Sequence, residues 1–291
     1  MAFSSTNTRT TGQSWIPRIL SDYVVDFREK NLQAAKYVTR RDVDLAGRGQ
    51  TVDFPVTSEL SSYNYADGDN LLDNLAVNTD TTKSITVNQV PMRPFLILDT
   101  LSKQAQQDTT AFRMREATYA VAKSIDSGIL AEVVDFSVNP IVNEATPTTA
   151  LTNISLTRAK YLLDANDVPF DDRAWFFQPQ VEKDLMDLTG NYFTSIDFGT
   201  DKPFVKGRLS RPLLGSDAVI TNNLPSGTAG SPATTYYKNA YFHRSAIGCV
   251  MQRDVDVQKE YILEAQGWLH NVRAMYGTTT LRGNHGVMLY R

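Results

Sequence analysis

Two strand-like runs are joined by a segment that is far longer than a hairpin turn. The runs Thr51-Val52-Asp53-Phe54-Pro55-Val56 and Ser84-Ile85-Thr86-Val87-Asn88 alternate apolar and polar residues, as half-buried strands do. Residues 57–83 between them are rich in turn-forming residues, and a structureless loop of that length is uncommon inside a compact monomer. A two-stranded hairpin is also only marginally stable alone in water. The pattern therefore predicts an extended β-hairpin arm that lies on another subunit.

The arm is acidic, whereas the segment before it is basic. Residues 49–82 hold six acidic residues and no Lys or Arg, while residues 9–48 hold eight basic and five acidic residues. Complementary charges steer association and fix its register. The alternative interpretation is that the acidic and the basic segment are two ordinary solvated surfaces. The candidates for charge complementarity between subunits are Arg40, Arg41, Arg48, Asp67, Asp69 and Asp73.

Large apolar side chains in the arm and near the N-terminus are the candidates for inter-subunit contact. Burying each of them would contribute about 1.5–3 kcal/mol. The N-terminal pair opens a short amphipathic helix that is expected to begin near Pro17, after a Ser/Thr-rich stretch that predicts a mobile arm over residues 1–14. The contact candidates are Trp15, Ile16, Phe54, Tyr63, Tyr65, Leu71, Leu72 and Leu75.

A long helix is predicted over residues 109–135. Apolar residues recur every four positions from Ala117 to Val133, and at 1.5 Å per residue the helix would be roughly 40 Å long. A single apolar stripe of that length requires a sheet or hairpin lying along it. The fold class is therefore α+β. The rest of the pattern predicts helices near residues 155–166 and 180–188, strands at 174–177 and within 204–225, a flexible loop at 226–235 and mostly strands to Arg291.

Composition and charge limit the function classes. The 291-residue chain has a net charge of −3, so it lacks the basic excess that holds a polyanion by phosphate neutralisation. Its single cysteine, Cys249, is expected to form neither an internal disulfide nor a zinc site. The sequence contains no run of 18 consecutive apolar residues, so we expect no membrane span. Its first residues lack the apolar stretch of a signal peptide. We therefore expect a protein of the reducing cytoplasm.

No motif predicts a cofactor or a metal ion. The sequence Gly47-Arg48-Gly49 lacks the third glycine and the following helix of a dinucleotide-binding loop. The acidic residues Asp67, Asp69 and Asp73 lack the spacing and the bidentate glutamate of a calcium-binding loop. An acidic turn is the simpler interpretation, with a weak divalent-cation site as the alternative.

Catalysis is not predicted either. His243, His270 and His285 are far apart in sequence and have no helical metal-ligand spacing, although a triad could still form in space. Asp171-Asp172 fits a charged turn better than a pair of catalytic carboxylates. A hydrolase that uses His243 or the Asp171-Asp172 pair is the enzymatic alternative, and it would need a pocket.

The order of these elements resembles that of the tailed-phage major capsid proteins, whose fold (the HK-ninety-seven type) is shared with herpesvirus shells and encapsulins. The resemblance runs over nearly the whole chain and rests on element order and diffuse motifs. Its first part lies in Arg48-Gly49-Gln50-Thr51-Val52-Asp53-Phe54-Pro55, similar to the start of the extended loop, and in Ala122-Lys123-Ser124-Ile125-Asp126-Ser127-Gly128-Ile129-Leu130, similar to the end of the spine helix. Later parts lie in Leu163-Asp164-Ala165-Asn166-Asp167-Val168-Pro169, Leu214-Gly215-Ser216-Asp217-Ala218-Val219-Ile220, Phe242-His243-Arg244-Ser245-Ala246 and Tyr276-Gly277.

The resemblance implies a fold with an N-terminal arm, an extended β-hairpin loop, a long spine helix, a peripheral domain with a long β-sheet, and an axial domain. It implies five divisions of the chain: 1–46, N-terminal arm and short helix; 47–100, extended loop and peripheral strands; 101–150, spine helix and peripheral domain; 151–254, axial domain; 255–291, closing strands of the peripheral domain. Some members of the family crosslink through a loop lysine. Since residues 49–82 contain no lysine and Lys83 sits on the returning strand, we expect no such crosslink here.

The function implied by the resemblance is that of a major capsid protein, not an enzyme. Such a protein self-assembles, as hexamers and pentamers, into the icosahedral or prolate shell that encloses the double-stranded DNA of a tailed bacteriophage, without sequence-specific binding. The other implied partners are a portal protein and, as further candidates, separate scaffolding and decoration proteins; no membrane and no cofactor is implied. The shell would assemble in the host cytoplasm and reside in the virion. An encapsulin-like compartment shell and another virion component, such as a tail protein, are the alternatives.

Overall fold

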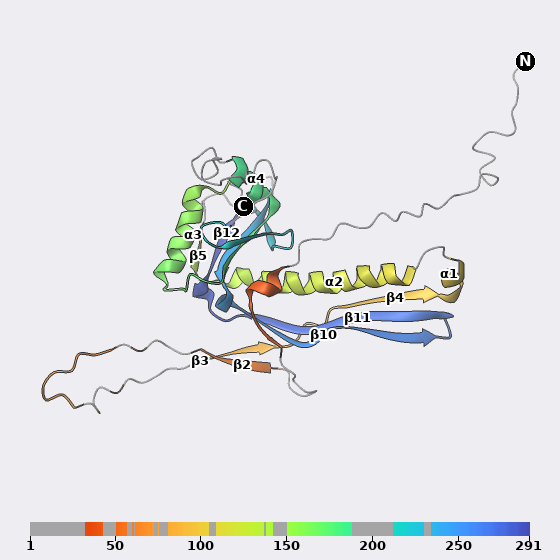
Figure 1. Ribbon diagram of the computed structural model, residues 1–291, viewed down its shortest axis with the longest axis horizontal. Helices are drawn as coiled ribbons and strands as arrows, with labels where there is room; N and C mark the ends of the chain where they lie inside the picture. Colours follow the sequence, from red (N-terminus) through yellow and green to blue (C-terminus); the bar gives the residue numbers. More distant parts are fainter. Residues whose placement is uncertain are drawn as a thin grey trace, which may run out of the picture.

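The computed structural model contains two β-sheets, a long helix and a projecting hairpin (Figure 1). The long helix and the longest strands run side by side, which gives this part of the molecule an elongated outline. The structure describes residues 33–42, 51–56, 60, 62–70, 72, 75, 81–104, 109–136, 138–141, 150–187, 212–229 and 234–291.

The elongated part is a four-stranded sheet with one helix along it. Its strand order is β1 (Thr39–Asp42), β10 (Ile247–Ile262), β11 (Gly267–Thr280) and β4 (Met92–Leu98). Strands β10 and β11 form a long antiparallel hairpin, β4 is antiparallel to β11, and β1 is parallel to the first residues of β10. The short helix α1 (Asp99–Gln104) follows β4 at the far end of the sheet (Figure 1).

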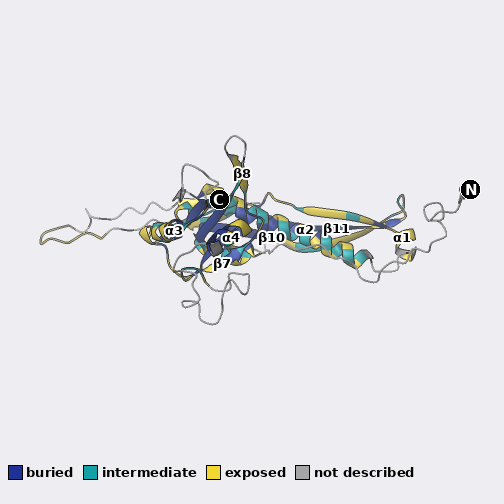
Figure 2. Ribbon diagram, turned by 90° about the horizontal axis from the view of Figure 1, so that it is seen from above, coloured by how far each residue is buried: buried dark blue, intermediate teal, exposed yellow. Residues whose placement is uncertain are grey.

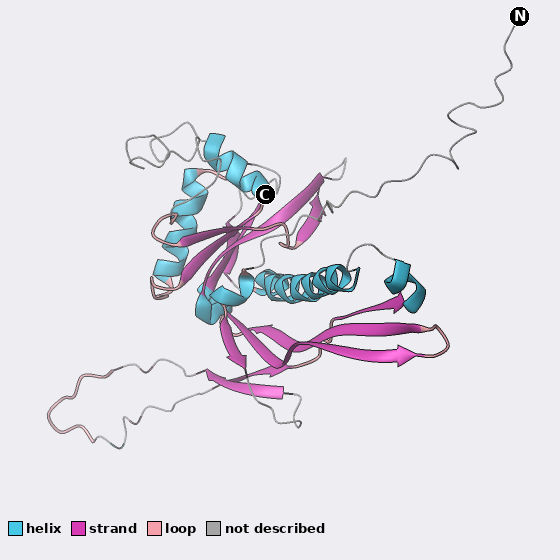
Figure 3. Ribbon diagram, turned by 45° about the vertical axis from the view of Figure 1, so that its right-hand side comes forward, coloured by secondary structure: helices cyan, strands magenta, loops and turns pink. Residues whose placement is uncertain are grey.

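Helix α2 (Thr109–Ala131) confirms the predicted long helix. Its apolar stripe is buried from Ala117 through Val121 and Ile125 to Ile129. The helix lies along the four-stranded sheet in Figure 3. The stripe continues through Val133 in the 3-10 turn η4 (Glu132–Asp135). The predicted requirement for a sheet along this helix is therefore met by β4, β10 and β11.

The second sheet has six strands and a core on each face. Its order is β5 (Val138–Ile141), β12 (Gly286–Tyr290), β9 (Thr234–His243), β6 (Arg173–Phe177) and β7 (Asp217–Ile220), and β8 (Ser226–Ala229) pairs with one end of β9. All five residues of β6 are buried. Phe176 stacks on Phe242 in the core that includes α2, while Trp175 stacks on Tyr241 in the core under α3 (Asn153–Ala165) and α4 (Pro179–Asp187). Figure 2 shows this sheet as the most deeply buried part of the chain.

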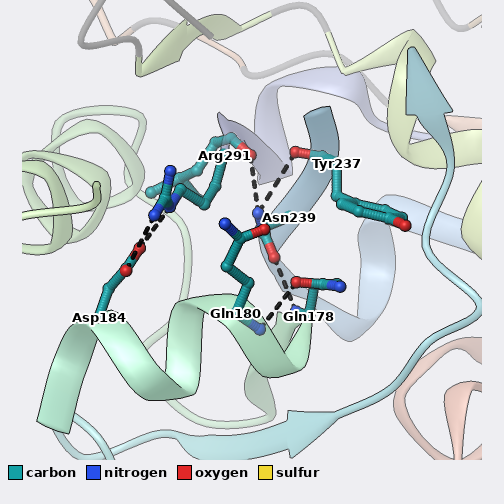
Figure 4. A network of polar contacts seen from close by, with 7 residues as sticks. Gln178, Gln180, Asp184, Tyr237, Asn239 and Arg291 are labelled. Carbon is teal, nitrogen blue, oxygen red and sulfur yellow. Dashed lines mark hydrogen bonds and ion pairs between the residues drawn. The ribbon is translucent and has the colours of Figure 1, made fainter. Parts of the chain in front are cut away.

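Helix α4 is joined to the six-stranded sheet by a polar network (Figure 4). The Asp184 carboxylate accepts two hydrogen bonds from the Arg291 guanidinium, and the Arg291 backbone exchanges two hydrogen bonds with Tyr237. The side-chain oxygen of Asn239 accepts a hydrogen bond from the Gln178 backbone N–H at 2.8 Å, just before the helix begins. The network therefore orients α4 on the sheet through Asn239 of β9 and through Arg291, which follows β12.

A two-stranded ribbon branches from the four-stranded sheet. Strands β2 (Thr51–Val56) and β3 (Thr81–Thr86) are antiparallel, with Thr51 opposite Thr86. They form the predicted hairpin, although the second strand begins and ends earlier than the predicted run at residues 84–88. The root of the ribbon is fixed by Ile85, which is fully buried against Val250. Gly277 of β11 makes this contact close, because a side chain there would meet the Thr86 backbone.

The buried carboxylate Asp126 connects α2 to two remote segments. Its Oδ1 accepts a hydrogen bond from the Ala34 backbone N–H, at the start of the 3-10 turn η2 (Ala34–Tyr37), and its Oδ2 accepts one from Asn223 Nδ2, both at 2.8 Å. Burial raises the pKa of Asp126, and these two hydrogen bonds oppose the shift. The carboxylate thus holds the segment before β1 and the segment between β7 and β8 against the same turn of the helix.

Some sequence expectations differ from the structure. Residues 226–229 and 234–235, expected in a flexible loop, belong to the paired strands β8 and β9, because their Ser and Thr residues suit an exposed ribbon. Strand β12 lies in the six-stranded sheet and β10 spans Ile247–Ile262, while the division of the chain at 254/255 stays a prediction. The predicted helix near Pro17 and the first strand of the 204–225 pair, before residue 212, fall outside the described residues.

Replacing Gly277 by alanine is expected to destabilise the chain by about 1–3 kcal/mol, the usual cost of overpacking. The new Cβ would lie 2.3 Å from the Thr86 carbonyl oxygen, so the backbone of β3 or β11 must shift. Gly128→Ala is the matched comparison, because its Cβ would meet only the end of the Tyr276 side chain and alanine favours the helix by about 1 kcal/mol. Chemical denaturation should show a larger decrease in the free energy of unfolding for Gly277→Ala than for Gly128→Ala. An equal or smaller loss would contradict this account of the ribbon root.

Replacing Asp126 by alanine is expected to lower the free energy of unfolding by about 2–4 kcal/mol. The change leaves the Ala34 N–H and the Asn223 amide without their charged acceptor in a buried place. Asp135→Ala, which removes an exposed carboxylate at the end of η4, should change stability by no more than about 0.5 kcal/mol. Thermal and urea unfolding of both variants measure the difference, and similar values for the two would count against the Asp126 junction.

Candidate inter-subunit contact surfaces

The arm beyond the β2–β3 ribbon presents apolar side chains to solvent. The described stretch 62–70 lies well away from both sheets in Figure 1, and Figure 2 shows it as exposed. Tyr63 and Tyr65 are exposed, and Leu72 and Leu75 are 72% and 69% exposed. Large apolar side chains stabilise a structure only when they are removed from water. These four candidates therefore obtain little burial from their own chain.

A local turn shapes the tip of the arm. The Asp69 N–H donates to the Ala66 carbonyl at 3.0 Å, and the Ala66 N–H donates back to Asp69 Oδ2 at 2.9 Å. Gly68 has a φ of +100°, a conformation that favours glycine. Both Asp67 and Asp69 are exposed in this turn. The arm thus carries its negative charge beside its exposed tyrosines.

The root of the arm is used within the chain. Phe54 is half-buried against the cluster of Ile85, Val87 and Val250, and the Arg41 guanidinium lies 5.9 Å from the centre of its ring. Arg40 and Arg41 are both on β1, in register with Cys249 and Val250 of β10. Part of the apolar surface of Phe54 is therefore already covered inside one subunit. The candidates Trp15, Ile16, Arg48, Leu71 and Asp73 lie outside the described residues.

A groove of about 470 Å³ lies between α2 and β4 on the four-stranded sheet. Its lining includes Phe95 and the small residues Ala117 and Ala120. Its charged lining residues are Arg93, Arg113, Lys123 and Glu116, and Arg113 Nη1 lies 2.8 Å from Glu116 Oε2. Three positive charges against one negative charge make the groove basic. The described part of the arm extends in the opposite direction from this groove (Figure 1).

Two further exposed apolar sets were not predicted from the sequence. Ile154 (76% exposed) and Tyr161 lie on the outer side of α3, seven residues apart and thus on one face of the helix. At the far end of the four-stranded sheet, Leu101, Leu263 and Trp268 are exposed together with Leu98. Their helical or strand spacing resembles that of core positions, so only the packing shows that they remain uncovered.

The described residues contain little that suggests catalysis. No three His, Cys, Asp or Glu side chains among them are placed to hold a metal ion. His270 is buried and stacks on Phe95, and Asp171 and Asp172 are exposed in the turn before β6. None of the described helices is long and apolar enough to cross a membrane. His243 and His285, far apart in sequence, do come together, with Ser245 between them.

Comparison with known proteins identifies the family. The family model for phage capsid proteins matches residues 97–287. No curated protein matches the sequence. Among solved structures, Mycobacterium phage Che8 is similar with a TM-score of 0.73 at 20% identity, over 94% of this chain and 97% of the other. The capsid of cyanophage P-SCSP1u gives 0.76 at 18% identity over 98% and 95%. Gordonia phage Cozz gives 0.69 at 11% identity over 99% and 96%.

These likenesses agree with the fold expected from the order of elements. The chain contains helices and strands, and its overall fold matches these capsid structures over nearly its full length. The family model covers residues 97–287, a range that includes α2, the β10–β11 hairpin of the four-stranded sheet, and β5 to β9. The chain therefore belongs to the phage capsid protein family and is a major capsid protein with the fold of tailed-phage shells.

Proposed function

We propose that this capsid protein self-assembles into a closed icosahedral or prolate shell around the double-stranded DNA of a tailed phage, and that the arm of each subunit lies on a neighbour. The observation that carries the proposal is the arm itself. Its tyrosines and leucines are exposed, and the described part of it lies away from both sheets of its own chain. A second copy of the chain offers these side chains the burial that they lack. The distance between the arm and the rest of its subunit makes this contact intermolecular.

The groove between α2 and β4 fits the role of the receiving surface. It has an apolar floor and a basic rim that includes Arg93 and Lys123, while the arm offers apolar side chains together with Asp67 and Asp69. Complementary charges of this kind guide the encounter and fix its register. The contact is heterologous, because each subunit gives an arm and receives one. Heterologous contacts build rings when the rotation between subunits closes, which suits hexamers and pentamers.

The charge of the chain suits an enclosing wall. A net charge of −3 gives little attraction for the DNA backbone, so the shell would surround the genome without binding a sequence. The proposal includes a portal protein in the shell, scaffolding and decoration proteins as further partners, and assembly in the host cytoplasm. The family model for phage capsid proteins favours this role over an encapsulin-like compartment or a tail protein. The role is structural and requires no catalytic step.

Deleting residues 60–78 is expected to abolish shells while leaving a folded, soluble chain. The deletion removes the exposed apolar residues of the arm but leaves the β2–β3 ribbon and its buried Ile85 in place. Negative-stain electron microscopy and sedimentation would detect closed shells or hexamer sheets, and circular dichroism would report the fold. A milder variant, Tyr65→Ser with Leu72→Ser, should weaken assembly, with Asn64→Ser as its matched control. Normal particles formed by the chain that lacks residues 60–78 would contradict the proposal.

Reversing charges in the groove is expected to slow assembly at low salt. Arg93→Glu with Lys123→Glu would turn the basic rim acidic and repel the arm, whereas adding Asp67→Lys and Asp69→Lys should restore much of the rate. Light scattering during assembly measures the rates. At high salt the differences should shrink, because screening weakens exposed charge interactions. If the double reversal in the groove assembles like the parent chain, the groove is not the receiving surface.

A further inference from the structure

The chain passes between the two sheets at two adjacent crossings. The first runs from β9 through the 3-10 turn η5 (Arg244–Ala246) into β10, and the second runs from β11 through η6 (Gly283–His285) into β12. The crossings are joined by backbone hydrogen bonds. The Ala246 carbonyl accepts from the N–H of Leu281 at 2.8 Å and from the N–H of Arg282 at 3.2 Å. The junction between the four-stranded and six-stranded sheets therefore includes this pair of turns.

A relay of three side chains joins the same two crossings. Ser245 Oγ lies 2.7 Å from His243 Nδ1 on its own crossing and 2.6 Å from His285 Nδ1 on the other. The Ser245 backbone N–H also donates to His243 Nδ1 at 3.2 Å. Residues 243 and 285 are thereby bridged by one hydroxyl, although they are separated by the whole β10–β11 hairpin. The relay is therefore a side-chain fastening between the two turns.

The backbone hydrogen bond to His243 assigns a protonation state to that ring, and one arrangement of the hydroxyl then satisfies the other ring. Because His243 Nδ1 accepts the Ser245 N–H, that nitrogen carries no proton, and the hydroxyl can donate to it as well. The hydroxyl oxygen is then free to accept a hydrogen bond from His285 Nδ1–H. A proton on His243 Nδ1 would end its role as an acceptor for the Ser245 N–H. With both rings charged, both Nδ1 atoms would donate to one oxygen, and the hydroxyl hydrogen would lose its acceptors in the relay.

The surroundings favour the neutral rings. Burial, the largest cause, lowers the pKa of His243; Arg173 acts in the same direction, and Asp172 and Asp171 oppose it. Burial together with Arg282 and His243 lowers the pKa of His285 to about 4. Since the unfolded chain would bind these protons near pH 6.5, the stabilisation is fully present above that pH and is lost as the pH falls toward about 4.

We propose that the His243–Ser245–His285 relay is an acid-sensitive fastening that holds the two crossings together at neutral pH and releases them in acid. Its release loosens the junction between the sheets locally. The cores beneath α2 and α3 contain no member of the relay and remain packed. The Arg244 side chain, which donates to the Val38 carbonyl, and the Arg244 N–H, which donates to the Asp172 carbonyl, keep the first turn on its other neighbours. The proposal goes beyond shell assembly and does not depend on it.

Hydrogen exchange of the full-length soluble chain at pH 7.5 and pH 5 tests the fastening. We expect the protection factors of the Leu281 and Arg282 amides, corrected for intrinsic rates, to fall by about tenfold or more at pH 5. Amides in the middle of β11 should change much less. Unchanged protection of the two turn amides in the parent chain would overturn the proposal without need of any variant.

Non-titrating variants identify the relay as the cause. His285→Asn and His243→Asn place an amide near the former Nδ1 and cannot be protonated, so the pH dependence of the turn amides should largely disappear while their protection at pH 7.5 is mostly kept. Ser245→Ala removes the bridge and should lower protection at both pH values. His270→Asn is the matched control, since this buried histidine lies on β11 against Phe95, away from the junction. A full acid response in both relay variants, or its loss in His270→Asn alone, would contradict the assignment.

Discussion

The burial of one apolar stripe of α2 against the long sheet is the constraint on which the rest of the structure depends. Among the described residues, the partner surface that matches the length of the stripe from Ala117 to Ile129 is formed by β4, β10 and β11. Gly128 allows the Tyr276 ring to approach the helix, and the Tyr276 hydroxyl donates to the Ser124 carbonyl at 3.0 Å. Because the buried stripe of the helix packs against the sheet, the elements attached to the ends of both acquire fixed positions.

The six-stranded sheet extends this core on one face and forms a second core on the other. Its residues alternate between two clusters, so Phe176 and Phe242 pack toward α2 while Trp175 and Tyr241 pack toward α3 and α4. Asp126 adds a polar connection from α2 to the segment beside this sheet. The arm is the opposite case, since its root is packed whereas the described residues of its far part are exposed. A subunit that is rigid at the centre and uncovered at the arm is suited to a lattice in which neighbours complete the packing.

The local sequence pattern was sufficient to predict an element where buried residues recur with the period of a helix or a strand. The period-four stripe predicted α2 closely, and alternation predicted β2 and β3 on either side of the arm. It failed at residues 226–229 and 234–235, where the pairing of β8 with β9 decides the conformation. It also could not assign β12 to a sheet, since a short strand of mostly buried residues suits either one. The charges of Asp67 and Asp69 were evident, whereas the basic groove was not, because its residues come from two distant segments.

The sequence by itself determined the long helix, the two strands on either side of the long arm, the acidic character of the arm and the resemblance to tailed-phage capsid proteins. These properties depend on residues that are close together in the chain, so they can be predicted from the periodicity and the composition of the sequence. Only the tertiary structure decided which surfaces stay exposed and which distant groups meet. The meeting of His243, Ser245 and His285 is the clearest case, because hydrogen bonds between two crossings depend on how both sheets are packed and on no local pattern.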